Sequence, residues 1–516
     1  MEIFIGASIL SIWHSILFWN QRIGFSGILF TIPLLIITMR IIKEKAKNPK
    51  ALLLSIPIIL LSSTYFIFNN EVFRTLNIII IPVLYVMMVI FTTTSKFELK
   101  AIIYKVIAMV IEPLNEFGEV FKNLKFAIIE KLNIKSKTKE KTNKANIVKA
   151  VFFTGIILII VLALLSSADD DFAEIIGNIL RWTTKISIPT LAIRILLIIF
   201  LFFYISAFFI DLLSKYNVLK EFEETEKVEK KESLTIRMIL VALNIVYLIF
   251  CFVEIKSLLT TENIIYSKFA RQGFFQLMIV SLINLVVILK ATNKNLEENE
   301  KQKKFKKTMC IIMLVFTLLI IISSFARMIM YQTQYGDTRL RILVDFTLIT
   351  EIILLIPTAI YIIKENINLS KSYFIIIVTM YCIINFANID KIIAKNNVDR
   401  FIETGKIDLD YLITLNSTDI TSELIRLKET NFKYYEINND NDEHRVEVYR
   451  ERLDKYLENE LKQLDENNRT IAETNLSEWF AQKALNDALW KEQKWEPTPD
   501  DFGTDPTKTK TEPAPN

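Results

Sequence analysis

The stretch TMCIIMLVFTLLIIISSFARMIMY, residues 308–331, contains Arg327 as its only charged residue. A helix needs about 20 mostly apolar residues to cross the hydrocarbon core of a bilayer. Residues 308–331 meet that requirement, so they predict a membrane-spanning helix that carries one charge near its end.

Ten more runs of the same kind occur along the 516 residues. The chain is 52% hydrophobic with a mean hydropathy of +0.35, yet 23% of its residues are charged, so the charges must lie outside the apolar runs. We therefore expect an all-α fold, a polytopic transmembrane helix bundle of about 11 spans. The predicted spans are residues 3–19, 23–42, 51–68, 75–94, 147–166, 186–210, 235–255, 274–290, 308–331, 342–363 and 372–388.

Lysine and arginine are distributed very unevenly between alternate connections. Five connections, beginning with residues 40–50, hold 32 basic residues, whereas the five that alternate with them hold 9. Basic residues near span ends favour the cytoplasmic side of a membrane. The count predicts a multi-pass protein of the cell membrane with a cytoplasmic amino terminus and an extracytoplasmic carboxyl-terminal tail.

The charge pattern also divides the chain into five regions. Residues 389–516 hold 18 basic and 28 acidic residues, a net charge of −10, with apolar residues three or four apart, which predicts a soluble, acidic and helical tail. Within 95–146, the segment Phe97–Leu132 predicts one or two helices, interrupted at Pro113, that lie in the inner interface or pack as a hairpin under the bundle. The expected regions are 1–94 (amino-terminal transmembrane helices), 95–146 (interfacial helices and a basic tether), 147–388 (transmembrane core), 389–490 (helical tail domain) and 491–516 (disordered tail).

Motifs for catalysis are scarce. His14 and His444 are the only histidines, so a histidine-rich zinc site or a Ser-His-Asp triad is hard to build. The glycine-rich loops that bind nucleotide phosphates do not occur in the sequence. We predict no catalytic residue, no metal site, no cofactor and no nucleic-acid partner, and the sequence leaves open whether the protein is an enzyme.

Polar residues nevertheless gather at the predicted outer ends of spans. Asp169 stands in LLSSADDDFAEIIGNILRW, where dense carboxylates are able to hold a hard cation but more simply cap a helix. Arg271 stands in IIYSKFARQGFFQL, on the side that positive charge usually avoids. Asp408 and Asp410 lie in NNVDRFIETGKIDLDYLITL, where Gly405 predicts a helix stop and the plain interpretation is a folded hinge between bundle and tail.

The connection after residues 308–331 is the most charged of these outer segments. Arg327 and Tyr331 are four residues apart and so share one face of a helix. Arg341 and Asp345 have the same spacing and could simply pair with each other. That pairing leaves Arg327 without a partner, and Glu351 in the next span is a candidate counter-charge.

Four of these segments together resemble a known family. SSADDDFA, YSKFARQGFFQL, RMIMYQTQYGDTRLR and DRFIETGKIDLDYL, with NLSEWFAQKAL near the end, are similar to the signature segments of a bacterial family of polytopic membrane proteins catalogued only as a domain of unknown function. The likeness runs from the region of the fifth span into the tail, with a weaker echo in LFWNQRIGF. Asp170 stands in place of a proline of the pattern, and Asp337 in place of an apolar residue. The resemblance implies a fold and a location but supplies no activity.

The topology and the resemblance combine into one hypothesis about a site. All these segments are predicted on the outer face, where three arginines would suit an anionic ligand such as a phosphate-bearing lipid or an envelope component. The predicted ligand-binding residues are Asp169, Arg271, Arg327, Tyr331, Arg341, Asp408 and Asp410.

Three functions remain open at this point. The first is a non-enzymatic envelope or sensory protein that sits in the lipid bilayer and binds its ligand through the outer face and tail. The second is a secondary transporter, in which prolines such as Pro33, Pro82 and Pro357 would break the spans. The third is a membrane enzyme that acts on lipid-linked substrates through the carboxylates of Asp169, Asp408 and Asp410.

Overall fold

The computed structural model describes residues 2–43, 46–94, 102–131, 190–214, 231–232, 234–259, 273–292, 296–297, 299–364, 367–435, 440–466 and 469–494. Within these ranges the fold is all-α, with 17 α-helices and one pair of two-residue parallel strands, β1 (Lys231–Glu232) and β2 (Leu296–Glu297). The chain forms two compact units. The membrane unit comprises Met1–Ile67, Glu71–Ile389 and Thr470–Asn475, and the tail unit comprises Phe68–Asn70, Asp390–Arg469 and Leu476–Asn516.

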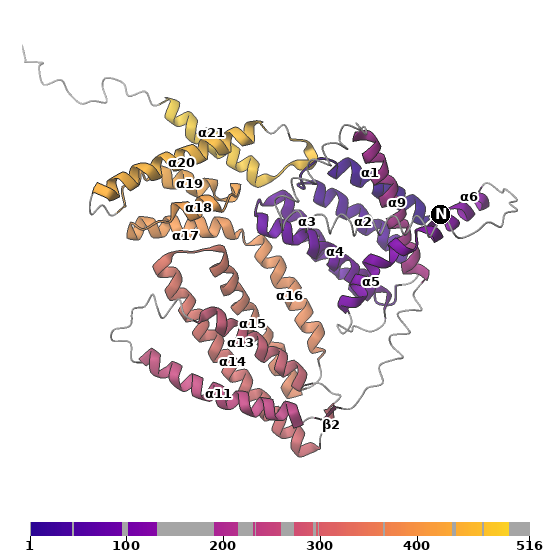
Figure 1. Ribbon diagram of the computed structural model, residues 1–516, viewed down its shortest axis with the longest axis horizontal. Helices are drawn as coiled ribbons and strands as arrows, with labels where there is room; N and C mark the ends of the chain where they lie inside the picture. Colours follow the sequence, from indigo (N-terminus) through magenta and orange to yellow (C-terminus); the bar gives the residue numbers. More distant parts are fainter. Residues whose placement is uncertain are drawn as a thin grey trace, which may run out of the picture. The chain divides into compact units, whose positions relative to one another are not determined.

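Ten apolar helices of the membrane unit correspond to ten of the eleven predicted spans (Figure 1). Eight are long and apolar enough to cross a membrane, and two are shorter. The predicted span at 147–166 lies outside the described residues. The two shorter helices are α1 (Glu2–Phe18) and α2 (Ser26–Ile42); the eight are α3 (Ser55–Ile67, extended by the 3-10 turn η2, Pro49–Leu54), α4 (Glu71–Thr93), α9 (Thr190–Ser214), α11 (Leu234–Leu259), α13 (Phe274–Ala291), α14 (Glu300–Tyr335), α15 (Arg339–Lys364) and α16 (Leu369–Phe386).

Helix α14 shows why an observed helix can be longer than the apolar stretch that predicts it. It begins in the charged segment before residue 308, where Asn299 and Gln302 form a capping box that satisfies two exposed backbone N–H groups. It ends at Tyr335, and the next residue, Gly336, has a φ of +77° that favours glycine. The charged segment before residue 308 also contacts the next helix, because Lys307 donates to the carbonyl of Ile363 in α15 at 2.8 Å.

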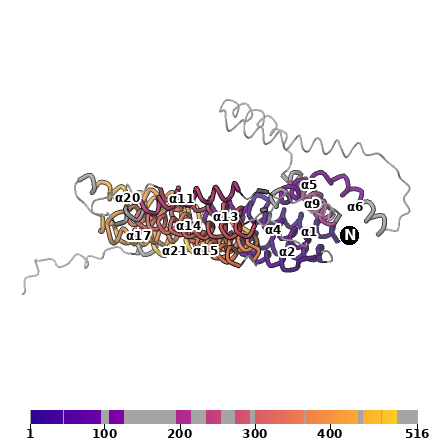
Figure 2. The backbone as a smooth tube through the Cα atoms, turned by 90° about the horizontal axis from the view of Figure 1, so that it is seen from below, coloured from indigo at the N-terminus to yellow at the C-terminus, as the bar shows by residue number. Residues whose placement is uncertain are grey.

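The membrane unit is a continuous series of packed helices. Helix α14 contacts α11, α13 and α15, and the series continues through α16, α3, α2 and α1 to α9. Figure 2 shows α1, α2, α4, α5 and α9 gathered together at the amino-terminal end of this series. Two further helices, α5 (Ile102–Asn115) and α6 (Phe117–Lys131), pack against α9. Pro113 lies inside α5 and the break comes at Glu116, so the interruption expected at Pro113 is displaced by a turn.

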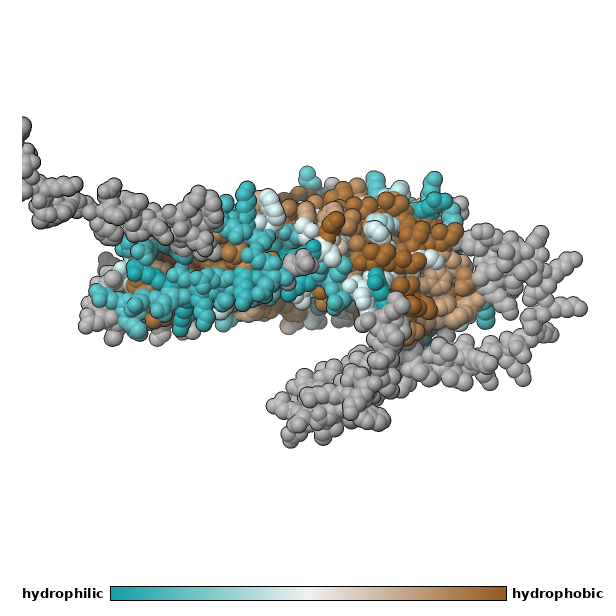
Figure 3. Space-filling view, turned by 90° about the horizontal axis from the view of Figure 1, so that it is seen from above, coloured by the Kyte–Doolittle hydropathy of each residue, from teal (hydrophilic) through white to brown (hydrophobic). Residues whose placement is uncertain are grey.

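The surface of the membrane unit is apolar where that of a soluble protein would be polar. Four isoleucines of α1 repeat on one face and are each about half exposed: Ile5, Ile9, Ile12 and Ile16. Helix α11 exposes a similar set, including Phe252 at 72%. Figure 3 shows a broad brown area over the amino-terminal helices. Such a surface is stable in contact with lipid, so this is a multi-pass membrane protein.

The tail unit has the opposite surface. Its helices bury single apolar faces, with Phe401, Leu424 and Leu485 almost fully enclosed. The face of the tail unit that Figure 3 shows is mostly teal. The segments TSELIRLKET and EVYRERLDKYLENELKQL lie in α19 and α20, which confirms the predicted amphipathic helices. The helices are α17 (Ile389–Thr404), α18 (Leu409–Thr414), α19 (Thr421–Glu429), α20 (Asp440–Glu466) and α21 (Leu476–Lys494), with the 3-10 turn η4 (Thr418–Ile420).

Candidate functional site

A cavity of about 470 Å³ lies within the membrane unit among α1, α2, α3 and α4. Most of its wall is apolar, with Phe18 of α1, Phe30 and Leu34 of α2, and Ile81 of α4 as examples. Seven side chains with polar atoms also reach the wall: His14, Gln21, Thr31, Ser62, Tyr65, Asn77 and Tyr85. The cavity is therefore suited to a mainly apolar ligand, and its polar side chains decide what else that ligand carries.

Most of these polar groups are already satisfied. Thr31 and Ser62 share a hydrogen bond of 2.8 Å between α2 and α3. The Tyr85 and Thr38 hydroxyls lie 2.7 Å apart, and the Tyr65 hydroxyl donates to the Arg74 carbonyl at 2.7 Å. These groups stabilise the packing of the wall and leave little hydrogen-bonding capacity for a ligand.

Asn77 anchors the wall on a buried network. Its Nδ2 donates to Thr64 Oγ1 at 3.1 Å and to Asn385 Oδ1 at 2.8 Å, and its Oδ1 accepts from the Tyr381 hydroxyl at 2.8 Å. Asn77 is fully buried and Asn385 is 3% exposed. The network joins α3 and α4 to α16, so this part of the cavity wall is held by three helices.

Two polar atoms of the lining residues are not satisfied. Nδ1 of His14 and Oε1 of Gln21 are buried and have no hydrogen-bond partner among the described residues. The rings of Phe18 and Phe30 lie 4.9 and 5.5 Å from that of His14, so the imidazole sits in an aromatic setting. A buried polar atom without a partner is costly, and a small side-chain rotation toward a polar group in the cavity would remove that cost.

One lining residue of the cavity lies partly on the outer surface of α4. Ile78 lines it and is also 56% exposed, and its neighbour Ile79 is 64% exposed. A ligand that reaches the cavity past these residues would come from an apolar environment.

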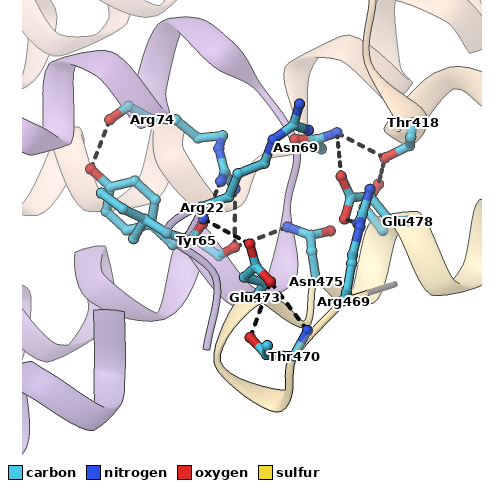
Figure 4. A network of polar contacts seen from close by, with 12 residues as sticks. Arg22, Tyr65, Asn69, Arg74, Thr418, Arg469, Thr470, Glu473, Asn475 and Glu478 are labelled. Atoms are coloured by element: carbon cyan, nitrogen blue, oxygen red, sulfur yellow. Dashed lines mark hydrogen bonds and ion pairs between the residues drawn. The ribbon is translucent and has the colours of Figure 1, made fainter. Parts of the chain in front are cut away.

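A short segment of the carboxyl-terminal region packs beside the cavity. Residues Thr470–Asn475, which we call the strap, belong to the membrane unit. Glu473 accepts from the backbone N–H of Arg22 at 3.0 Å, and the Thr474 carbonyl accepts from the Phe25 N–H at 3.1 Å. Asn475 donates to the Tyr65 carbonyl at 2.9 Å, as Figure 4 shows. The strap therefore holds the α1–α2 connection, which includes Gln21, against the end of α3.

Gly24 and Arg74 complete this attachment. A Cβ atom on Gly24 would lie 2.6 Å from the Glu473 carbonyl oxygen, so only glycine fits without moving backbone. Arg74 donates to the carbonyls of Tyr65, at 3.0 Å, and Ile23, and its guanidinium lies over the Tyr65 ring. In the tail unit, Glu478 accepts from Asn69 at 3.4 Å and pairs with Arg469 (Figure 4).

The predicted pair of Arg341 and Asp345 is absent from the described residues. Arg341 instead donates to the carbonyls of Tyr335 and Gly336 and lies 4.3 Å from the Tyr331 ring centroid. Asp345 accepts from Gln332. The prediction was wrong because the last turn of α14 offers unsatisfied carbonyls that are nearer to the guanidinium than the carboxylate one turn on.

The expectation that Arg327 lacks a partner was also wrong. Arg327 has an interaction within the protein, and its Nη1 lies 3.3 Å from where a Cβ of Gly273 would be. Glu351 is not its counter-charge, because the carboxylate of Glu351 contacts Ser281 instead. Thr338 accepts from the Arg341 N–H at 3.4 Å and so caps the start of α15.

The two aspartates of the tail have structural roles in the tail unit. Asp408 caps α18 by accepting from the Tyr411 N–H at 3.0 Å, and Asp410 pairs with Arg452 at 2.6 Å. Gly405, with a φ of +70°, follows α17 and confirms the predicted helix stop. Asp169 and Arg271 lie outside the described residues. The predicted site therefore stays a prediction; among its described residues, Tyr331 and Arg341 are in direct contact.

Sequence reasoning missed the residues of the cavity. His14 was considered only as one of two histidines too few for a zinc site or a triad, and Asn77 was not distinguished from the apolar residues around it. A polar residue inside a predicted span was the available signal for both. The close approach of the strap has no signal in sequence spacing, since Arg22 and Glu473 are 451 positions apart.

Comparison with known proteins adds the family. The family model described as a domain of unknown function, DUF4153, matches residues 55–427, which is more than half of the chain. The chain belongs to the DUF4153 family. The match confirms the resemblance inferred from the sequence, but it begins at α3 rather than near the fifth predicted span. No curated protein and no solved structure matches. Helices α1 and α2 and the strap lie outside the DUF4153 match, so half of the cavity wall does too.

Proposed function

We propose that this DUF4153 protein is a non-enzymatic membrane protein that binds a lipid-class ligand in the α1–α4 cavity. The observation that carries the proposal is an apolar cavity, lined in part by the surface-exposed Ile78, whose lining includes two buried polar atoms that have no hydrogen-bond partner among the described residues. Its volume of about 470 Å³ is in the usual range for small-molecule sites. An acyl chain would fill the apolar part.

The polar part of the ligand would bind next to the α1–α2 connection. Gln21 and His14 would supply hydrogen bonds, and Arg22, which is exposed, and Arg74, which contacts Ile23, add positive charge at this end. An anionic headgroup is favoured over a neutral one for this reason. The proposal keeps the anionic, outer-face ligand expected from the sequence but moves it to residues that the sequence did not single out.

The test is photo-crosslinking to a lipid in nanodiscs. A diazirine-labelled phosphatidylglycerol should crosslink to peptides of α2 and α4, and more strongly than the matching phosphatidylcholine probe. Leu34→Trp, which fills the cavity, should reduce crosslinking severalfold. Ile36→Trp adds the same ring on an exposed position of the same helix and should leave crosslinking unchanged. His14→Leu and Gln21→Leu should weaken the preference for the anionic probe.

Equal crosslinking to the Leu34→Trp and Ile36→Trp variants would refute the cavity as the binding site. Crosslinking confined to α14 and α15 would instead place the ligand at Tyr331 and Arg341, the site predicted from the sequence. Equal labelling by both lipids would show that the site does not prefer an anionic headgroup.

The transporter and enzyme alternatives receive less support. Pro33, Pro82 and Pro357 lie inside continuous helices, so they do not mark broken spans. Asp408 and Asp410 are engaged as a helix cap and an ion pair. In the described residues no group of three or more His, Cys, Asp or Glu side chains is placed to hold a metal ion.

A further inference from the structure

Glu351 is an acidic residue in the middle of an apolar helix. It is the thirteenth of 26 residues in α15, so about 18–20 Å of helix separate it from each end at about 1.5 Å per residue. Its side chain is 1% exposed, and the surrounding core is built from residues such as Met278, Ile321 and Leu348. A carboxyl group at this depth is a candidate for function rather than for stability.

The hydrogen bonds around Glu351 indicate that it carries a proton. The Ser281 hydroxyl lies 2.7 Å from the carbonyl of Met278 and is also hydrogen-bonded to Oε2 of Glu351. A serine hydroxyl has one proton to donate, and a carbonyl oxygen has none. Both hydrogen bonds form together when Ser281 donates to Met278 and Glu351, as a carboxylic acid, donates to Ser281.

The charges on the neighbouring helices do not offset an ionised Glu351. Its side chain forms no ion pair in the described residues, and its Oε1 has no hydrogen-bond partner there. Helix α13 carries one charged residue, Lys290, in its last turn. On the other helices packed nearby, the charged residues lie toward the helix ends. Tyr373 of α16 is hydrogen-bonded to Thr358, and Asp345 accepts from Gln332. The charged residues are Glu300, Lys301, Lys303, Lys304, Lys306, Lys307 and Arg327 of α14, Arg339, Arg341, Asp345 and Lys364 of α15, and Lys371 of α16; the other titratable ones are Cys310, Tyr331, Tyr335, Tyr361, Tyr381 and Cys382. An unpaired carboxylate in this setting would be very costly, whereas the neutral acid is tolerated.

Polar side chains continue from Ser281 along the same face of α13. Asn284, three residues on and fully buried, donates to Thr317 of α14 at 3.1 Å and accepts from the Tyr247 hydroxyl of α11 at 2.6 Å. These contacts join α11, α13 and α14 next to the site. A shift of α15 against α13 would break the contact of Glu351 with Ser281 while this second set of bonds still holds the other three helices.

We propose that Glu351 is an intramembrane proton-binding site, occupied in this structure, and that its proton completes the hydrogen bonds that join Ser281 to both Met278 and Glu351. Without that proton, the Ser281 hydroxyl would donate to only one of the two. The arrangement of α13–α15 would then depend on proton binding. This inference is independent of the proposed lipid site, which lies among other helices.

The test is infrared difference spectroscopy of the full chain in nanodiscs. At neutral pH, the spectrum of the wild type minus that of Glu351→Gln should contain the carbonyl stretch of an un-ionised carboxylic acid. The Asp345→Asn variant is the matched control, because Asp345 is a second carboxyl of α15; the band assigned to Glu351 should persist in it. Ser281→Ala should shift the same band, since it removes the hydrogen-bond partner.

The proposal is overturned if the difference spectrum at neutral pH shows the loss of an ionised carboxylate instead. It is also overturned if the band is present but Ser281→Ala leaves it unmoved. Should Glu351→Gln fail to fold, the band shift between the wild type and Ser281→Ala decides the matter by itself.

Discussion

At the scale of single residues, short-range geometry decides which side chains are available to a ligand. Arg341 illustrates this, because the carbonyls at the end of α14 and the ring of Tyr331 occupy its guanidinium. Gln21 illustrates the reverse, since its Oε1 is buried without a partner among the described residues. The arginine attracts attention in the sequence, yet the glutamine is the better candidate for binding.

Gly24→Ala tests the attachment of the strap. The new methyl group would meet backbone oxygens of Glu473 and Thr474 at 2.6 and 2.8 Å, so the strap has to move, at a cost of about 1–3 kcal/mol. Hydrogen exchange should accelerate at the Phe25 amide, which donates to Thr474. In Gly6→Ala the new methyl group meets the γ2 methyl of Ile37 at 2.7 Å and no atom of the strap, so exchange at Phe25 should stay at the wild-type rate. Unchanged exchange in both variants would contradict the close contact.

At the scale of elements, the helices of the tail unit bury the apolar faces that their sequences predict. Some polar atoms are buried with them. Glu460 of α20 accepts from the Thr421 hydroxyl at 2.8 Å, and its Oε2 has no partner in the described part of the chain. Burial raises the pKa of Glu460 to about 7. The packing of α20 on α19 therefore depends on the protonation of one side chain.

The pH dependence of the tail unit follows from this pKa. Because the folded pKa lies above the ordinary value of 4.5, Glu460 stabilises the folded tail at low pH, and this contribution is lost as pH rises through about 7. Amide exchange in α20 should therefore be faster in the wild type than in Glu460→Gln at about pH 8, with the two compared at the same pH. The gap should close at about pH 5.

Glu458→Gln supplies the control for this experiment. Glu458 is exposed on the same helix, so its replacement should leave the pH dependence as it is in the wild type. An effect of equal size in Glu458→Gln would point to overall charge rather than to burial.

At the scale of the whole molecule, the proposed topology places the amino terminus in the cytoplasm and the tail outside. The strap, which is tail sequence, contacts the connection between α1 and α2, and the lysine and arginine count predicts that both lie outside. Two segments in contact must lie on the same side of the membrane. The strap therefore supports the prediction that the tail and the α1–α2 connection share one side.

Cysteine labelling in intact cells tests the absolute direction. A membrane-impermeant maleimide should label Glu451→Cys, on an exposed position of α20, and should label Lys304→Cys, in the segment before residue 308, only after the cells are opened. The three native cysteines are buried and supply little background. Labelling with the opposite pattern would invert the topology and place the strap on the cytoplasmic side.

The apolar runs alone determined that the chain is helical and spans a membrane, because about 20 apolar residues without charge have no other stable arrangement in lipid. A local signal was also reliable, since Gly405 predicted the end of α17. Only tertiary structure decided the rest: which polar atoms find partners, as with Arg341, Glu351 and Gln21, and which distant segments meet, as with Arg22 and Glu473. These outcomes depend on how helices face one another, and residue spacing within one helix carries no information about that.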